Sequence, residues 1–482
     1  MKAQNQESSS KLKLTAAFVA ESLEHSIKNN QRVEFTAVVS DSRKVVKGCL
    51  FVALKGEKFD GHTFIDSAIE KGARGIVYNK DYKFKCNGTV SSFPVENTES
   101  AYRELARHWR MLFNIPVICI SGSVGKTTTK EILASILKGK LQHVLKTQGS
   151  QNGFVGIPMT LLDIREEHSA AVVEVGIDEV GAMEKHLSVV IPTVSVLTSI
   201  AEEHLEKLID IETVAVEEMK ALSFVAEKGG TIVVNLDDQR IRKAAEAIKS
   251  SDIIYVSLID DTNRHAYSFS DAQFIRGSIV GVDEVEITGF GLKNVKFKIP
   301  LLGRHNARNF LLTVAVARVL GLEVDEINSG LQTFQSAGGR SDVVKMKDGT
   351  IVLCDYYNAN PASVRAGLVL LGQFAKLGTK KWACLGDMLE LGTSEEKLHR
   401  DLAHSLIKEK IDHVFLYGPR MRFLLDELQK LQFKGELKHF ASHEALAEEL
   451  SKSIKADGVV IIKGSRGMRM EEVWNRFKER EV

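Results

Sequence analysis

The 482-residue chain has few prolines, few cysteines and no long hydrophobic run. It contains only 7 prolines, so no proline-rich segment marks a hinge between domains. The absence of a run of about 18 apolar residues argues against a transmembrane helix. Neither sign of charge dominates, because 64 basic residues are balanced by 63 acidic ones. We therefore expect neither nucleic acid nor an anionic membrane as a partner.

The cysteines are odd in number and far apart: Cys49, Cys86, Cys119, Cys354 and Cys384. This spacing is typical of small buried hydrophobic residues in a reducing compartment, and it favours neither disulfides nor a zinc site. Residues 1–13 are polar and lack an apolar segment, so we expect a frayed tail and no secretory signal. Both observations favour a cytoplasmic protein.

The length exceeds what a single hydrophobic core supports, and the residue pattern predicts three α/β domains. A smaller N-terminal α/β domain covers residues 1–113. Residues 114–336 alternate apolar strands with amphipathic helices, such as the helix expected at 211–227. This alternation predicts a central P-loop-type domain with a mostly parallel sheet and flanking helices. Residues 337–482 repeat the alternation and predict a Rossmann-like C-terminal domain.

A phosphate-binding loop is the most informative segment of the chain. Residues 121–129 read Ser-Gly-Ser-Val-Gly-Lys-Thr-Thr-Thr, between an apolar strand at 117–120 and a helix that includes 130–137. The glycines let backbone N–H groups approach an anion, and the helix N-terminus adds a partial positive charge. Lys126 can reach β- and γ-phosphates, and the Thr127 hydroxyl can hold Mg²⁺. Ile120 stands where the common loop has a glycine, so this loop is a short variant.

Three charged residues beyond the loop are candidates for the same site. Glu174 ends an expected strand, where Mg²⁺ would find a hard oxygen ligand. The alternative for Glu174 is a solvated strand end. His204 follows the next strand and is either a site residue or a structural loop histidine. Lys220 lies on the following helix, where a solvated lysine is the alternative.

Amides and carboxylates mark further candidates. Asn306 and Asn309 are spaced i, i+3 at a helix start and could read an adenine edge, or could serve as a cap and a surface amide. Asp355 opens the polar string 355–361, which follows a strand and is otherwise a simple Asn/Pro turn. Because the strings 386–392 and 463–467 also end strands, we expect all three strings along one edge of the C-terminal sheet.

These strings together resemble the Mur ligases of peptidoglycan synthesis, over about residues 40–472. Residues 122–128 resemble the family's ATP loop, and residues 41–43, 51–56 and 60–62 resemble its uridine-nucleotide-binding part. The strings 355–361, 386–392 and 463–466 resemble the branch that adds D-Ala-D-Ala. The resemblance implies an ATP-dependent ligase that acts on UDP-N-acetylmuramoyl-tripeptide and D-Ala-D-Ala through an acyl phosphate. It also implies a monomer.

The resemblance assigns roles residue by residue. It implies ATP-binding roles for Gly122, Ser123, Gly125, Lys126, Thr127, Thr128, Asn306, Asn309, Arg340 and Asp355. It implies substrate-binding roles for Ser42, Arg43, Lys55, Asp60, Gly61, His62, Thr147, Asn152, Asn358 and Asn360. Two Mg²⁺ ions would be held by Thr127, Glu174 and His204, and the catalytic residues would be Lys126, Lys220 and His204. Lys220 corresponds to a lysine that is carbamylated in the family.

Some segments depart from the family pattern. Ser150 and Gly153 replace asparagines, and residues 199–204 read Ser-Ile-Ala-Glu-Glu-His in place of Asn-Ile-Gly-x-Ala-His. The sequence leaves open whether the third tripeptide residue is meso-diaminopimelate or lysine. Two alternatives also stay open: a related Mur or folylpolyglutamate-type ligase with another acceptor, and a catalytically inert nucleotide-binding paralogue.

Overall fold

The computed structural model describes residues 12–25, 32–56, 59–84, 90–248, 250, 252–259, 273–375 and 378–479. Cys86 and residues 1–11 of the expected tail lie outside these ranges. The chain forms two compact units. The first comprises Met1–Cys119, Leu141–Val175 and Glu184–Thr193, and the second comprises Ile120–Lys140, Gly176–Met183 and Val194–Val482. Each unit is described by itself.

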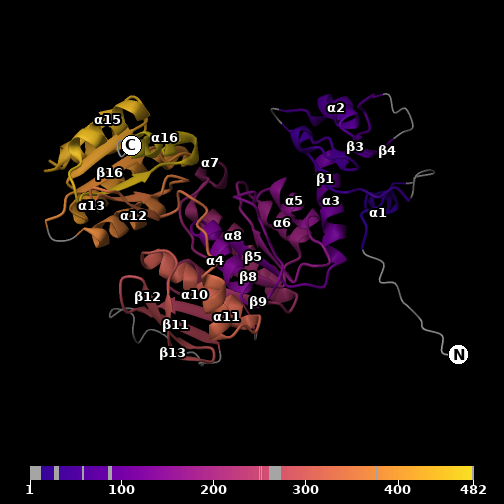
Figure 1. Cartoon of the computed structure of the whole chain (residues 1–482), viewed down its shortest axis with the longest axis horizontal. Coiled ribbons are helices and arrows are strands. Elements are labelled where there is room, and N and C mark those ends of the chain that lie inside the picture. The colour runs from indigo at the N-terminus through magenta and orange to yellow at the C-terminus, as the bar shows by residue number, and fades with distance from the viewer. Residues whose placement is uncertain are drawn as a thin grey trace. The chain divides into compact units, whose positions relative to one another are not determined.

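The first unit contains a four-stranded parallel sheet in the order β1-β2-β3-β4. Its strands are β1 (Val38–Val39), β2 (Leu50–Val52), β3 (Gly75–Asn79) and β4 (Ser91–Val95), and the helices beside them in sequence are α1 (Ala16–Ser22), α2 (Ile65–Glu70) and α3 (Thr98–Met111) (Figure 1). Phe51, Ile65 and Ile76 are buried in one apolar cluster. The strands therefore form because their apolar side chains leave water together.

A second part of this unit pairs β6 (Val144–Lys146) in parallel with β7 (Ala170–Glu174). Helix α5 (Gly156–Leu162) lies between these strands in sequence and packs on α3. All five residues of β7 are buried, as expected for a strand covered on both faces.

The second unit begins where β5 (Val117–Ser121) ends, and there Ser121 O accepts a hydrogen bond from the Thr198 backbone N–H. Strands β8 (Val194–Leu197), β9 (Thr231–Asn235), β10 (Ile253–Leu258) and β11 (Phe274–Ile279) are parallel, and β12 (Glu284–Gly289) and β13 (Leu292–Lys298) continue the sheet antiparallel. The accompanying helices are α4 (Lys126–Leu137), α6 (Ala182–Val190), α7 (Leu205–Leu208), α8 (Ile211–Glu227), α9 (Gln239–Ala247), α10 (Arg304–Val319) and α11 (Val324–Leu331). Helix α6 straddles the boundary between the units. Helix α10 packs on α4 and on the sheet.

A six-stranded sheet follows in the order β14-β15-β19-β16-β17-β18. It consists of β14 (Asp342–Lys345), which is antiparallel, and the parallel strands β15 (Ile351–Cys354), β16 (Lys381–Gly386), β17 (His413–Tyr417), β18 (Glu436–Phe440) and β19 (Val459–Lys463). Figure 1 shows α12 (Pro361–Phe374) and α13 (Glu395–Lys408) on one side of this sheet and α15 (His443–Ser453) and α16 (Glu471–Lys478) on the other. The remaining helix is α14 (Met421–Lys430).

The architecture confirms the predicted α/β class with parallel-rich sheets. Because β15, β19 and β16 are parallel neighbours, the three strings that follow them meet at one edge, as expected. The antiparallel hairpin of β12 and β13 was not predicted. Cys49, Cys119, Cys354 and Cys384 are buried, as predicted for the cysteines that the structure describes. In the described part of the chain, none of the helices has the length and apolarity needed to cross a bilayer.

Candidate active site

The phosphate loop joins β5 to α4, and its two glycines are required by its geometry. Gly122 and Gly125 have φ values of 113° and 95°, a conformation that residues with a Cβ rarely adopt. A Cβ on Gly122 would lie 2.4 Å from Thr198 Oγ1, and one on Gly125 would lie 2.6 Å from Asn309 Oδ1. Helix α4 begins at Lys126, and Thr127 is buried in its first turn. The loop therefore has the predicted form.

Lys126 lies over this loop, beside two glutamates. Its Nζ donates hydrogen bonds to Gly122 O and Ser123 O, and it lies 3.5 Å from Glu203 Oε2. Glu218 on α8 accepts a hydrogen bond from the Gly122 N–H at 2.8 Å. The Glu218 side chain is fully buried, and that of Glu203 is 11% exposed. The loop is thus lined by one ammonium and two carboxyl groups.

Burial raises the pKa of both carboxyl groups. For Glu218 the pKa rises to about 8, because burial and the nearby charge of Glu203 outweigh the opposing effect of Lys126. Glu218 is therefore mostly protonated at neutral pH. The sequence analysis did not nominate this residue. A signal was present, because Glu218 lies on the same helix face as the apolar residues Val214 and Leu222.

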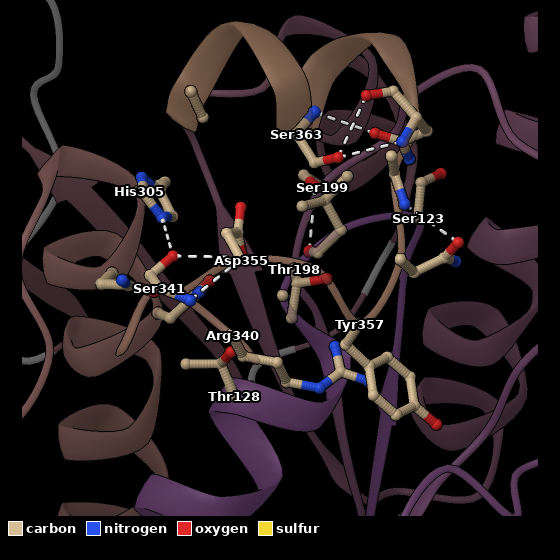
Figure 2. Close-up of a pocket in the computed structure, with 18 of the residues that line it drawn as sticks. Ser123, Thr128, Thr198, Ser199, His305, Arg340, Ser341, Asp355, Tyr357 and Ser363 are labelled. Atoms are coloured by element: carbon tan, nitrogen blue, oxygen red, sulfur yellow. Dashed lines mark hydrogen bonds between the residues drawn. The ribbon is translucent and has the colours of Figure 1, made fainter. Parts of the chain in front are cut away.

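A cavity of about 140 Å³, here called the first cavity, adjoins the loop (Figure 2). Its walls come from the phosphate loop, the ends of two strands, the start of α10, and the segments around β14 and β15. It is lined by Ser123, Gly125, Thr128, Thr198, Ser199, His305, Asn306, Arg308, Asn309, Arg340, Asp355, Tyr357, Asn358, Asn360 and Lys463, among others. Most residues predicted to bind ATP therefore share one space.

The start of α10 supplies the two predicted amides. Asn306 Nδ2 donates a hydrogen bond to Leu302 O at 2.8 Å, and Asn309 packs against Gly125. Both side chains are buried on the cavity wall. Directly before Asn306 lies His305, and burial lowers its pKa to about 4. His305 is therefore neutral at physiological pH and can accept as well as donate a hydrogen bond.

The residues around β14 and β15 supply charge to the same cavity. The Arg340 guanidinium lies 3.9 Å from the ring centroid of Tyr357, and Figure 2 shows the two side chains together. Asp355 Oδ2 accepts a hydrogen bond from Lys463 Nζ at 2.6 Å, and its Oδ1 accepts one from the Ser341 N–H at 3.0 Å. Lys463 is buried, and sequence reasoning placed it only within a string, without nominating it as a site residue.

A second cavity, also of about 140 Å³, shares Asn358, Ala359 and Asn360 with the first. Glu203, His204, Glu390 and Arg466 also line it. His204 Nδ1 lies 2.5 Å from Glu390 Oε2. Burial lowers the pKa of His204, but the hydrogen bond to Glu390 and the charge of Glu203 outweigh this effect, and the net result is a raised pKa. Asn360 caps α12 through the Ser363 N–H.

In the first unit, three predicted residues lie together at the end of β7. Glu174 is buried, and its Oε1 accepts a hydrogen bond from Asn152 Nδ2 at 2.8 Å. The Glu174 backbone N–H donates to Thr147 Oγ1 at 3.0 Å. This arrangement fixes a hard carboxylate at a strand end, which suits a divalent cation.

The predicted uridine-binding residues form locally bonded turns. His62 is buried, with Nδ1 2.5 Å from Asp60 Oδ1, and its Nε2 accepts a hydrogen bond from the Asn79 N–H at 2.9 Å. A Cβ on Gly61 would lie 2.6 Å from Leu54 O. Lys55 pairs with Asp60 in an isolated antiparallel bridge.

Ser42 and Arg43 form a separate short helical turn. Ser42 O accepts a hydrogen bond from Lys71 Nζ at 2.9 Å. Arg43 is 87% exposed and pairs with Asp41 at 2.8 Å. That exposed guanidinium remains accessible to a ligand.

Lys220 pairs with a neighbouring glutamate. Its Nζ donates a hydrogen bond to Glu217 Oε1 at 2.7 Å, and Glu217 Oε2 accepts another from the Gly181 N–H at 3.0 Å. Over the described ranges, no three His, Cys, Asp or Glu side chains gather in a cluster that could hold a metal.

Three protein-family models match successive parts of the chain. "Mur ligase family, catalytic domain" matches residues 34–110, "Mur ligase middle domain" matches 120–317, and "Mur ligase, glutamate ligase domain" matches 339–466. Over 455 residues the chain is 30% identical to a ligase of Escherichia coli (strain K12), and the alignment covers 93% of this chain and 94% of the relative. The chain belongs to the Mur ligase family.

Within the family, the similarity points to one activity. The Escherichia coli relative is a UDP-N-acetylmuramoyl-tripeptide–D-alanyl-D-alanine ligase. The enzyme of that name from Bacillus subtilis (strain 168) is 29% identical over 467 residues, covering 96% of this chain and 98% of the relative. The structure of MurF ligase from Thermotoga maritima in complex with ADP matches with a TM-score of 0.77 and 26% identity, covering 92% of this chain and 97% of that one.

Proposed function

We propose that this chain is an ATP-dependent ligase that joins D-Ala-D-Ala to UDP-N-acetylmuramoyl-tripeptide. The first cavity carries the proposal, because the phosphate loop, the two amides of α10, Arg340 and Asp355 line one space. Full-length relatives with this activity in their names support the reaction, and the ADP in a related structure supports the nucleotide.

The reaction brings together two anions, the tripeptide carboxylate and the γ-phosphate of ATP, which explains why the site contains cationic residues. ATP phosphorylates the terminal carboxylate of the tripeptide, the dipeptide amine attacks the acyl phosphate, and the tetrahedral intermediate collapses to the amide and phosphate. Lys126 can exchange its bonds to loop carbonyls for phosphate oxygens, and Arg340 adds a second cation. The backbone N–H groups at the α4 N-terminus hold the phosphates, so catalysis depends mainly on positioning.

Magnesium fits the donor groups that the chain offers. The Thr127 hydroxyl and the buried Glu174 carboxylate are hard oxygen ligands, and His204 is the predicted ligand of a second ion. When bound, the ions would neutralise phosphate charge. Carbamylation of Lys220 stays a prediction. It would place an anion beside Glu217, so it requires the observed ion pair to open. Intact-mass measurement in bicarbonate buffer tests it.

The first unit would bind the UDP-linked substrate through Ser42, Arg43, Lys55, Asp60, Gly61, His62, Thr147 and Asn152. We further infer a cytoplasmic monomer, because the reaction uses soluble nucleotide substrates and the family resemblance implies a single chain. Gel filtration with light scattering tests the oligomeric state.

Phosphate release tests the proposed function. The assay combines ATP and Mg²⁺ with each UDP-tripeptide, ending in meso-diaminopimelate or lysine, and with either D-Ala-D-Ala or single amino acids. We expect phosphate release when the acceptor is D-Ala-D-Ala and none when it is a single amino acid. Release with a single amino acid would instead support a ligase with another acceptor. Absence of release with every acceptor would support the inert paralogue.

A further inference from the structure

Arg340 reaches the first cavity from a turn before β14 whose backbone is fixed at two points. Gly339 and Ser341, on either side of Arg340, have φ values of 66° and 57°. Gly339 O accepts a hydrogen bond from the Tyr357 N–H at 3.0 Å. The Ser341 N–H donates one to Asp355 Oδ1 at 3.0 Å. The segment after β15 therefore holds the backbone of this turn in place.

The ring of Tyr357 contacts the group at the end of the Arg340 side chain, which the backbone bonds do not fix. The Arg340 guanidinium carbon lies over the ring, 3.9 Å from its centroid (Figure 2). At this distance the ring attracts the cation and packs against its planar group. The N–H donors of a guanidinium lie in its plane, so a contact through the flat face occupies none of the donors that bind phosphate oxygens.

A second guanidinium lies over the same ring. Arg466, in the turn after β19, has its guanidinium carbon 5.3 Å from the Tyr357 centroid. Its Nη1 also pairs with Glu471 at 3.1 Å. Two like charges near one ring repel each other, and the attraction of each to the ring partly offsets that repulsion. The ring therefore helps to keep both cations near the first cavity, whose wall includes Tyr357 itself.

We propose that Tyr357 is a positioning residue, whose ring holds the Arg340 guanidinium where the phosphates of ATP bind. The inference rests on the proposed function for the identity of the nucleotide, and it adds the group that orders the second phosphate-binding cation. A guanidinium that is ordered before ATP arrives loses less conformational freedom on binding, so the phosphates are held more tightly. The face of the ring does this, and the hydroxyl is not required.

Direct binding of nucleotides tests the role of the ring. In calorimetry with Mg²⁺ and no acceptor, we expect Tyr357→Leu to raise the Kd for ATP about 3- to 30-fold, the range of a cation–π contact. Tyr357→Phe keeps the ring and should stay within about twofold of the parent. Adenosine has no phosphate, so its Kd should be the same in all three. Equal losses for adenosine and ATP would show that the ring stacks on the base, and a weak Tyr357→Phe would assign the effect to the hydroxyl; either result overturns the inference.

A fluorinated ring tests the contact without a change of shape. 3,4,5-Trifluorophenylalanine in place of Tyr357 withdraws electrons from the ring face, which weakens its attraction for a cation. We expect the Kd for ATP to rise at least about threefold over that of Tyr357→Phe. This variant keeps the packing of the ring, so it gives the answer even if Tyr357→Leu does not fold. An unchanged Kd would show that attraction to the ring does not hold Arg340.

A double-mutant cycle tests whether Tyr357 acts through Arg340. Arg340→Met should raise the Kd for ATP about 10- to 100-fold, and adding Tyr357→Leu to it should change the Kd by less than about twofold. Arg469→Met is the matched control, because this guanidinium follows β19 in the same turn as Arg466, is 68% exposed and pairs with Glu472. Combined with Arg469→Met, Tyr357→Leu should keep its full effect. Additive losses with Arg340→Met would show that Tyr357 acts independently, and the inference would be wrong.

Failure of this inference is distinct from failure of the proposed function. If the parent ligates D-Ala-D-Ala and the effects of Arg340→Met and Tyr357→Leu are additive, the function stands and Tyr357 does not position Arg340. If the parent binds ATP, the two effects overlap and no acceptor is ligated, the positioning role stands and the proposed function falls. A parent that does not bind ATP would contradict both.

Discussion

The loop at residues 122–126 in the second unit and the turn at residues 60–62 in the first unit are both short glycine-containing motifs, but their surroundings differ. In the turn, Asp60 bonds to His62, and the His62 ring accepts from the Asn79 N–H. In the loop, Gly125 and its neighbours line a cavity, and the adjacent Glu203 has a carboxylate oxygen without a donor in the described structure. The polar groups of the turn are satisfied internally, whereas those of the loop region are partly unsatisfied.

This difference separates motif residues whose polar groups are satisfied by the fold itself from motif residues whose polar groups face a cavity. A buried polar group with internal partners stabilises a turn, and its removal costs stability. A polar group that lines a cavity or lacks a partner destabilises the folded chain, so we expect it to bind a ligand. Substitutions in the two regions should therefore change different measured quantities.

The largest effect is expected for Lys126→Ala. Without the ammonium, the phosphates lose their main protein cation, so we expect kcat to fall at least about 1,000-fold. Thermal stability should fall as well, because the substitution leaves the nearly buried Glu203 carboxylate without its ammonium at 3.5 Å, so kcat is measured at a temperature where the variant is folded. The exposed Lys138→Ala on the end of the same helix is the control and should keep kcat within about twofold. Parent-like turnover in Lys126→Ala would show that this lysine of the phosphate loop takes no part in the reaction.

Lys463→Met should have the next largest effect, on stability. It leaves the Asp355 carboxylate without its buried partner at 2.6 Å, and such losses cost about 3 kcal/mol. Amide hydrogen exchange in β15 and β19 measures the local free energy of opening. The exposed Lys452→Met is the control and should change it by less than about 0.5 kcal/mol. Equal protection from hydrogen exchange in Lys463→Met and the parent would show that water solvates the Asp355 carboxylate well enough to replace Lys463.

His62→Ala tests the turn, where we expect a loss of stability of about 2 kcal/mol. The substitution removes an acceptor from the part-buried Asn79 N–H and leaves space beside Tyr82. Hydrogen exchange in β3 should report the loss, while kcat at saturating substrate should stay near the parent value. A fall in kcat with unchanged exchange would make His62 a direct participant and would contradict the comparison drawn above.

Local pattern was enough to predict the elements that hold the loop. The helix Ile211–Glu227 has the predicted bounds, because an amphipathic stripe defines it without tertiary context. The hairpin of β12 and β13 was missed, although its alternating pattern buries Val285 and Ile287. Its outward residues are charged, so the strands lack the continuous apolar run that is typical of the parallel sheet expected in this region.

The site was predictable where a motif defines it and not where packing defines it. The loop glycines and the amides Asn306 and Asn309 follow from residue type and spacing. The pairing of Asp355 with Lys463 joins residues far apart in sequence and depends on the order of strands in the sheet. The apolar helix face predicts that Glu218 is buried, but its hydrogen bond from the Gly122 N–H depends on how α8 packs, which no local pattern specifies.

Glu218→Gln should have the smallest effect, seen in how stability depends on pH. The pKa of Glu218 is about 8 in the folded chain against an ordinary value of 4.5, so the folded state binds more protons between these values. The stability that Glu218 contributes is therefore fully present below about pH 4.5 and is lost as the pH rises toward 8. Glutamine mimics the protonated acid and should flatten this slope.

Urea unfolding across that range measures the slope, and Glu212→Gln on the same helix is the control. Its side chain is exposed, so the slope should match the parent. A slope that persists in Glu218→Gln would assign the pH dependence to another group. A flat slope in Glu218→Gln alone would show that Glu218 is protonated in the folded chain. A protonated acid suits this position, because an ionised carboxylate 2.8 Å from the Gly122 nitrogen would compete with phosphate for that N–H.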